Sequence, residues 1–150
     1  MARNYAKGIY EVQNPQKYIG SKSPTYRSSW EYSFMKYLDD HPDVIAWASE
    51  PIRIPYYNVF KKKTTVYVPD FLVRYQDKNG GLKTELIEIK PMSQTLQEKA
   101  KGIQNKLQVA LNRMKWAAAQ NWCKKNGCKF VILTEEQLYK ATGTYKPRKR

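Results

Sequence analysis

Residues 65–90 read TVYVPDFLVRYQDKNGGLKTELIEIK and carry the clearest structural signal in the chain. The first part, residues 65–75, is rich in β-branched and aromatic residues and predicts one strand. Residues 77–81, DKNGG, place an Asn-Gly pair at the tip of a tight turn. Residues 85–90, ELIEIK, predict the returning strand, which Pro91 ends. The whole stretch therefore predicts an antiparallel β-hairpin.

The predicted hairpin gathers two acids and a lysine. Alternate residues of a strand share a face, so Glu88 and Lys90 point the same way. A turn centred near Asn79 sets Asp70 opposite Glu88, within about one residue, and facing residues have Cβ atoms about 5 Å apart. Two carboxylates this close repel each other unless a cation lies between them. Oxygen ligands of this kind suit Mg²⁺ or Mn²⁺.

These side chains match the needs of phosphodiester hydrolysis. The reaction requires neutralised charge on the phosphate, an activated water and a stabilised leaving oxygen. A metal ion on Asp70 and Glu88 would meet the first need and help with the second, while Lys90 would polarise the phosphate and orient or deprotonate the water. The alternative is structural: a turn residue after Pro69 and an exposed Glu88–Lys90 pair. The apolar residues flanking both acids favour the catalytic interpretation.

A helix is predicted before the hairpin, from about residue 28 to Asp40, with Ser28 or Ser29 as its N-cap. Its apolar positions have helical spacing: Trp30, Phe34, Tyr37 and Leu38. Glu31 lies on the same stripe, and a carboxylate on an inward stripe needs a cation or a metal as partner. Glu31 is therefore a candidate fourth member of the site. The alternative is a boundary glutamate whose tip reaches water.

The remaining elements complete an α/β fold in a single domain, residues 1–150. Residues 44–47 and 52–57 predict strands, residues 94–126 a long helix, and residues 129–134 a buried strand. The apolar stripe expected for the long helix comprises Leu96, Ile103, Leu107, Ala110, Leu111, Met114, Ala117 and Ala118. Strand, helix and strand without a hairpin predict a right-handed crossover between parallel strands. The predicted parts are a basic arm (1–26), a core (27–140) and a basic tail (141–150).

The chain is strongly basic, with 27 Lys and Arg against 13 Asp and Glu, a formal net charge of +14. An excess of this size implies a polyanionic partner, either nucleic acid or an anionic surface. The arm at 1–26 interleaves cations with aromatics, which suits nucleic acid, or it simply packs on the domain. Candidate phosphate contacts are Lys61, Lys62, Lys63, Lys99 and Lys106, with plain solubility as the alternative for each.

Other classes of protein are disfavoured by what the chain contains. Two cysteines, Cys123 and Cys128, with one histidine, His41, do not make a zinc site and suit a thiol pair in a reducing compartment. No apolar run approaches the length of a transmembrane helix, and the first residues lack the apolar region of a signal peptide. The expectation is a soluble protein that is neither secreted nor membrane-bound.

The pattern Pro69-Asp70, seventeen residues, then Glu88-Ile89-Lys90 resembles the motif of the PD-(D/E)xK nuclease superfamily. With Glu31 on a preceding helix and a helix and strand following, the order resembles the transposon-end nuclease subunit of Tn-seven-like transposons. The run YIGSKSPTYRSSWE at 18–31 extends a resemblance over nearly the whole chain to the head completion nucleases of T-even-like phages.

The resemblance implies a restriction-endonuclease-like core, with a mixed central sheet flanked by helices. It implies Mg²⁺, with Mn²⁺ as a substitute, held by Asp70, Glu88 and the backbone carbonyl of Ile89, with Lys90 as the catalytic lysine and Glu31 as the early-helix acid. It further implies processing of packaged DNA ends before tail attachment. The partners would be capsid, portal or other head completion proteins, in the host cytoplasm or the virion.

Two other functions stay open from the sequence. One is a non-catalytic DNA-binding assembly protein that keeps the nuclease fold. The other is a junction resolvase or repair nuclease that shares the same active site and differs in the DNA it prefers. Single- or double-strand preference and oligomeric state are not determined by the sequence.

Overall fold

The computed structural model describes residues 7–90, 102–134 and 136–138, with the side chains of residues 102–105 left out. Its elements in chain order are β1 (Gly8–Ile9), η2 (Pro15–Lys17), β2 (Thr25–Tyr26), α1 (Ser29–Asp40), β3 (Val44–Ser49), β4 (Ile54–Asn58), β5 (Lys63–Tyr67), β6 (Phe71–Gln76), β7 (Leu82–Lys90), α3 (Gly102–Asn126) and β8 (Lys129–Thr134). Lys99 and the predicted tail at 141–150 lie outside the described residues.

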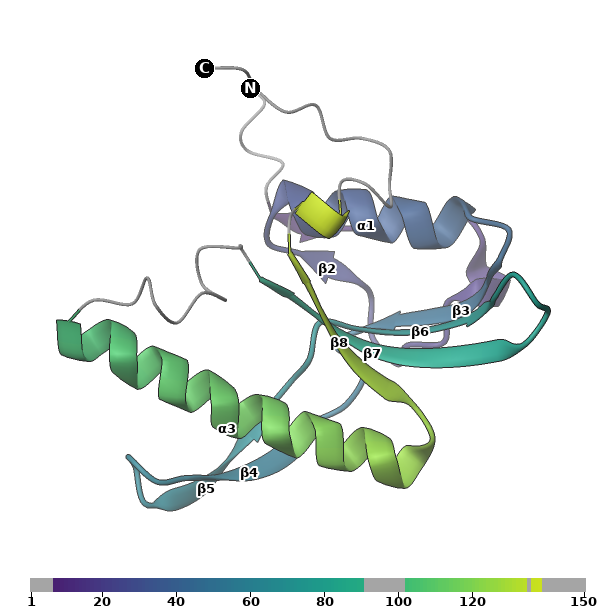
Figure 1. The fold of residues 1–150 in the computed structure, drawn as a ribbon. Helices are drawn as coiled ribbons and strands as arrows, with labels where there is room; N and C mark the ends of the chain where they lie inside the picture. The colour runs from purple at the N-terminus through teal and green to yellow at the C-terminus, as the bar shows by residue number, and fades with distance from the viewer. Residues whose placement is uncertain (1–6, 91–101, 135, 139–150) are drawn as a thin grey trace.

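A mixed four-stranded sheet forms the centre, in the order β3-β6-β7-β8. The pairs β3–β6 and β6–β7 are antiparallel, whereas β8 runs parallel to β7. Helix α1 lies over one face of the sheet and α3 over the other (Figure 1). The α/β class, the flanking helices and the parallel pair β7–β8 are therefore confirmed.

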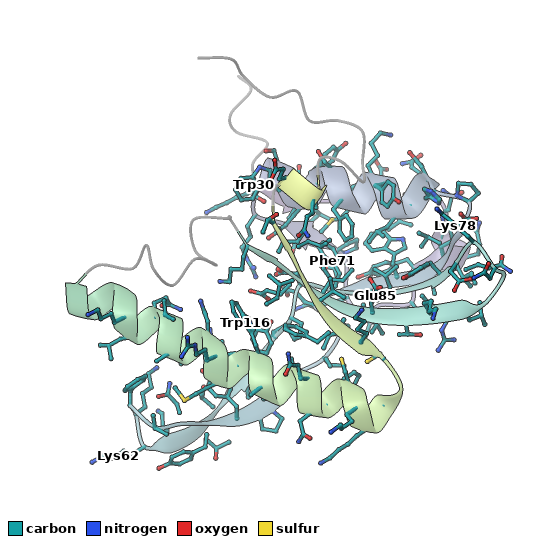
Figure 2. The ribbon with its side chains drawn as sticks, in the orientation of Figure 1. Trp30, Lys62, Phe71, Lys78, Glu85 and Trp116 are labelled. Atoms are coloured by element: carbon teal, nitrogen blue, oxygen red, sulfur yellow. The ribbon has the colours of Figure 1, made fainter. Side chains whose placement is uncertain are left out.

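The face beneath α1 holds the larger core. Phe71 and Val73 of β6, and Ile87 of β7, alternate onto this face and are almost fully buried. Phe34 of α1 meets Phe71 edge-on, with ring centroids 5.2 Å apart, and Figure 2 shows Phe71 between the helix and the sheet. Because alternate residues of a strand share a face, the odd-numbered side chains of β6 and β7 point toward α1.

The opposite face receives α3, and here the predicted helix stripe is only partly right: Ala118 packs on this face, whereas Ala117 is exposed. Leu96 and the side chain of Ile103 lie outside the described part of the chain. The buried side of α3 carries Asn112, Ala119 and Cys123, with Trp116 packed on the same cluster (Figure 2), whereas Leu107 is 42% exposed. Apolar residues lie on more than one side of this helix, and the side bearing Trp116 and Trp122 is the one that packs against the sheet and β4.

The predicted strand 65–75 is in fact two strands. β5 ends at Tyr67 and pairs with β4 in a separate hairpin, whereas β6 begins at Phe71 in the central sheet. Pro69, which is buried and lacks an N–H group, occupies the break. The predicted hairpin of residues 71–90 is confirmed: the Asp77 carboxylate accepts from the Asn79 and Gly81 amides, both at 2.9 Å.

The predicted basic arm packs on the domain over residues 7–26, as one of its two interpretations expected. β1 pairs with β2, Tyr10 is 5% exposed, and its hydroxyl donates to Asp39 Oδ2 at 2.7 Å. Tyr18 stacks edge-on against Trp47, with centroids 4.7 Å apart. Residues 1–6 lie outside the described part of the chain.

Two further expectations concern the cysteines and membranes. Cys123 and Cys128 are both free thiols, and Cys123 is buried under the sheet. Among the described helices, none combines the length and apolar character needed to cross a membrane.

Candidate active site

Asp70 is fixed at the point where the chain enters the central sheet. Its N–H donates to the Ile87 carbonyl at 3.0 Å, and its carbonyl accepts from the Glu50 N–H at 2.9 Å. Its side-chain Oδ2 accepts from the Ile89 N–H at 2.7 Å. Because Phe71 pairs with Ile87, Asp70 faces Glu88 one position beyond that pair. The structure thus brings together the two acids that the hairpin register predicts.

Glu88 lies on β7 among buried residues and is itself 8% exposed. Its Oε2 lies 3.5 Å from Lys90 Nζ, and its Oε1 accepts a 2.7 Å hydrogen bond from the Tyr67 hydroxyl. With Leu86, these residues occupy the α3 face of the sheet, since even positions of β7 point that way. Tyr67 therefore fixes one carboxylate oxygen and Lys90 lies beside the other.

Sequence reasoning missed Tyr67. On one continuous strand, Tyr67 and Asp70, three residues apart, would point to opposite faces. The break at Pro69 turns the chain between them, so the tyrosine at the end of β5 reaches Glu88. The buried Pro69, directly before the acid, was the only local signal that the strand does not run through.

Helix α1 brings Glu31 near enough for its charge to act on Asp70 and for the charge of Glu88 to act on it. Glu31 lies in the first turn, where its N–H donates to the Ser28 N-cap hydroxyl at 3.2 Å. Its Oε1 accepts from the Arg27 N–H at 2.7 Å. Burial raises the pKa of Glu31, the Arg27 contacts partly oppose this, and the charges of Glu50 and Glu88 add to it. Glu31, Asp70 and Glu88 are called the acid cluster below.

The positive charge of Lys90 does not offset the effect of burial and of the neighbouring acids on Asp70. Burial raises the pKa of Asp70 well above its usual value, and the charge of Glu88 and then of Glu31 raises it further. The Ile89 N–H bond and the charge of Lys90 oppose this rise only in part. A carboxyl group whose pKa is raised by burial and by neighbouring carboxylates is typical of a functional site, and a bound cation would oppose that rise.

A divalent cation fits this donor set. Within the described chain no three Asp, Glu, His or Cys side chains are already grouped as a metal site. Mg²⁺, however, takes one or two carboxylates and completes its shell with waters and substrate phosphates. Asp70 Oδ1 makes no hydrogen bond to any described residue, so it is free to be a ligand beside Glu88. The Ile89 carbonyl stays a predicted ligand.

A second lysine approaches from α3. Lys115 Nζ lies 5.9 Å from the centroid of the Tyr67 ring, and it forms no ion pair with any described carboxylate. Burial lowers the pKa of Lys115, as does the charge of Lys90, while Glu88 opposes the change and Lys61 adds to it. Lys115 therefore belongs to the same electrostatic neighbourhood, although no sequence pattern distinguishes it from the other lysines of the chain.

Cations also line a cavity beside Asp70. The cavity, about 540 Å³, is lined in part by Lys22, Arg27 and Arg53. Glu50, whose N–H bonds to the Asp70 carbonyl, lies 2.7 Å from Lys22 and 2.6 Å from Arg27. Positive charge thus borders the acid cluster on this side as well.

The predicted phosphate-contacting lysines lie on two elements. Lys61, Lys62 and Lys63 are exposed around the end of the β4–β5 hairpin, and Lys106 is exposed on α3. None lies within the acid cluster itself, so their expected contacts with DNA stay predictions.

Comparisons with known proteins identify relatives of the chain. Residues 41–135 match the family model described as the TnsA-like endonuclease N-terminal domain. The chain is also 37% identical over 142 residues to the head completion nuclease of Enterobacteria phage T4, covering 87% of this chain and 92% of that protein. Asp70, Glu88 and Lys90 lie inside the matched range 41–135, and Glu31 precedes it.

Proposed function

The chain belongs to the TnsA-like endonuclease family and is a nuclease, and we propose that it hydrolyses DNA in a metal-dependent reaction at the acid cluster. The observation that carries the proposal is the pairing of Asp70 and Glu88 beside Lys90. Burial and the neighbouring acids raise the pKa of Asp70, and Lys90 lies 3.5 Å from Glu88. A structural cluster would have its charges balanced by the fold, whereas this one needs an added cation.

Each residue then has a chemical task. When bound to Asp70 and Glu88, with Glu31 and the Ile89 carbonyl nearby, Mg²⁺ or Mn²⁺ would neutralise phosphate charge and lower the pKa of a bound water. Lys90 is placed to contact the scissile phosphate and to orient the attacking water. Tyr67 and the Ile89 N–H hold the two carboxylates in position, so little reorganisation is needed when DNA arrives.

The similarity to the T4 head completion nuclease supports a biological setting. It covers most of both chains, and the net charge of +14 suits DNA as the substrate. The proposed role is processing of packaged DNA ends during head completion, before tails attach. Capsid, portal or other head completion proteins would be the partners, in the host cytoplasm or the virion.

The direct test is cleavage of linear and circular DNA with Mg²⁺, Mn²⁺ or EDTA. Asp70→Asn, Glu88→Gln and Lys90→Ala are each expected to lower the cleavage rate by about 100-fold or more, because the first two remove a ligand of the metal ion and the third removes the cation beside the phosphate. DNA binding in EDTA should persist. Cutting of the circular substrate would define the enzyme as an endonuclease.

The control is Lys124→Ala, at the exposed C-terminal end of α3, which should cut like the wild type. Folded Asp70→Asn protein that cuts as fast as the wild type would refute the proposed site. Wild-type protein that binds DNA but cuts with neither metal would instead indicate a non-catalytic DNA-binding assembly protein. Strong selectivity for four-way junctions would indicate the resolvase alternative.

A further inference from the structure

The end of the β4–β5 hairpin exposes apolar and basic side chains together. Val59 is 53% exposed and Phe60 is 49% exposed, and the exposed lysines Lys61, Lys62 and Lys63 follow directly. Residues 59–63 are called the hairpin tip below. Figure 2 shows Lys62 at the outermost end of the hairpin, away from the central sheet. An aromatic ring kept in water at a projecting tip is a marker of a binding surface.

The tip is held in one shape. Asn58 is 3% exposed, and its Oδ1 accepts from the Phe60 N–H at 2.8 Å and from the Lys61 N–H at 3.0 Å. The Asn58 carbonyl accepts from the Lys62 N–H at 2.8 Å, and Lys62 adopts a left-handed φ of 55°. A non-glycine residue in that region is kept there by its surroundings. The exposed ring is thus presented by a preorganised turn.

The hairpin is also anchored beside the acid cluster. At its base, Ile54 and Tyr67 are buried against α3, and Tyr67 donates to Glu88 at 2.7 Å. Lys63 and Tyr67, four residues apart on β5, are separated by about 13 Å, which corresponds to about four nucleotide steps of 3.4 Å. Duplex DNA with a phosphate at the acid cluster therefore extends naturally to the tip.

Positive charge runs along this path. Lys61 is exposed at the tip, Lys115 Nζ lies 5.9 Å from the centroid of the Tyr67 ring, and Lys90 Nζ lies 3.5 Å from Glu88. The phosphates of DNA, which follow one another at short intervals along the backbone, match this series of cations. The charges favour DNA over a protein partner as the occupant of the tip, because an apolar protein surface would leave three consecutive lysines unpaired.

We propose that the hairpin tip is a wedge that opens DNA, with Phe60 and Val59 inserted at a base step and Lys61–Lys63 on the flanking phosphates. This inference rests on the proposed nuclease function and specifies its substrate. Unstacking a step costs a few kcal/mol in intact duplex and less where stacking is already weak. The preferred substrates are therefore DNA ends, nicks and flexible steps, about four nucleotides from the cut.

The test measures DNA opening without cleavage. A duplex carries the fluorescent base 2-aminopurine at successive positions from a nick, and binding is followed in EDTA. Wild-type protein should raise the fluorescence at one or two positions, because an unstacked 2-aminopurine is brighter. Phe60→Ser should abolish the rise while binding remains. Phe60 is half exposed, so the variant should keep the fold.

Leu82→Ser is the matched control, since Leu82 is 63% exposed and begins β7 beside Lys83, at the other hairpin. It should give the wild-type fluorescence. Lys61→Ala should instead lower the slope of log affinity against log salt by about 0.9, the value of one phosphate contact.

Three outcomes separate the wedge from the nuclease. No fluorescence rise with the wild type, or an equal rise with Phe60→Ser, would overturn the wedge, and the tip would then serve a protein partner. A rise that Phe60→Ser loses supports it. If the wild type opens DNA but cuts none in Mg²⁺, the proposed nuclease site fails and the wedge stands.

Discussion

Two tyrosine–carboxylate pairs of the same length lie in different parts of the molecule. Tyr10 donates to Asp39 at 2.7 Å beneath the N-terminal segment, and Tyr67 donates to Glu88 at 2.7 Å in the candidate active site. Around Asp39 the other neighbours are donors: the Gln13 N–H at 2.7 Å and the Asn14 N–H at 3.0 Å. The pairs look alike, but their surroundings differ.

The surroundings lower the pKa of Asp39 and raise the pKa of Asp70, the acid that faces Glu88. Burial raises the pKa of Asp39, yet the Gln13, Tyr10 and Asn14 hydrogen bonds outweigh it, and the net pKa is lowered. Burial also raises the pKa of Asp70, and there the neighbouring acids add to the rise. An acid whose charge the fold itself stabilises is structural, whereas a buried acid whose pKa is raised by neighbouring acids is typical of a functional site.

The largest effect should come from removing the charge of Asp39, which is the centre of the structural hydrogen-bond network. Asp39→Asn turns an amide N–H₂ toward groups that donate, and it removes charge-assisted hydrogen bonds. We expect the free energy of unfolding to fall by about 3 kcal/mol, measured by urea unfolding at pH 7. Because the folded pKa of Asp39 is lowered, its stabilisation is present above the unfolded pKa and is lost as the pH falls through the folded value.

The matched control is its neighbour. Asp40→Asn removes only an exposed ion pair with Lys36, at 3.3 Å, and should cost about 0.5 kcal/mol or less. Equal losses for Asp39→Asn and Asp40→Asn would show that Asp39 is not the centre of a hydrogen-bond network that secures residues 7–26 to α1.

A change in the acid cluster should act in the opposite direction. In EDTA at pH 7, Asp70→Asn is expected to raise the free energy of unfolding by about 1 kcal/mol, as when a strained functional site is relieved. A raised folded pKa means that wild-type stability increases as the pH falls from the folded toward the unfolded pKa. The variant should lose that slope, measured as the thermal midpoint against pH.

The metal ion provides the control for this change. Mg²⁺ should raise the thermal midpoint of the wild type, since it binds the folded state, and should leave Asp70→Asn nearly unchanged. An Asp70→Asn protein that is less stable than the wild type in EDTA would mean that the carboxylate is structural, like Asp39.

The sequence predicts the surroundings of Asp70 and Glu88 better than it predicts those of Asp39. The Asn79-Gly80 turn fixes the register of one hairpin, and register alone sets Asp70 beside Glu88. Asp39 depends on Tyr10, 29 residues away, in a segment with no periodicity to place it. Contacts that depend on how separate elements pack, rather than on local geometry, were not accessible to pattern reasoning.

The same distinction explains two errors near the site. Lys115 and Tyr67 meet because α3 packs on the β4–β5 hairpin, and the expected stripe of α3 pointed to other residues. The single strand predicted at 65–75 runs through the break at Pro69. Predicting that break would have required knowing that β5 pairs with β4, outside the central sheet. When a long helix has apolar residues on several sides, its sequence alone does not identify the buried side.

The smallest effects should separate the two tyrosines themselves. Tyr10→Phe and Tyr67→Phe each remove one hydroxyl and one hydrogen bond while keeping the ring. Tyr10→Phe should lower the free energy of unfolding by about 1 kcal/mol and leave cleavage unchanged.

Tyr67→Phe should change stability less, because it releases a carboxylate that is already crowded by other acids. It should slow cleavage about five-fold and raise the Mg²⁺ concentration needed for half-maximal rate, since Glu88 is no longer held in one orientation. A Tyr67→Phe variant that loses as much stability as Tyr10→Phe, with an unchanged requirement for Mg²⁺, would make the two pairs alike and remove the distinction between a structural and a functional centre.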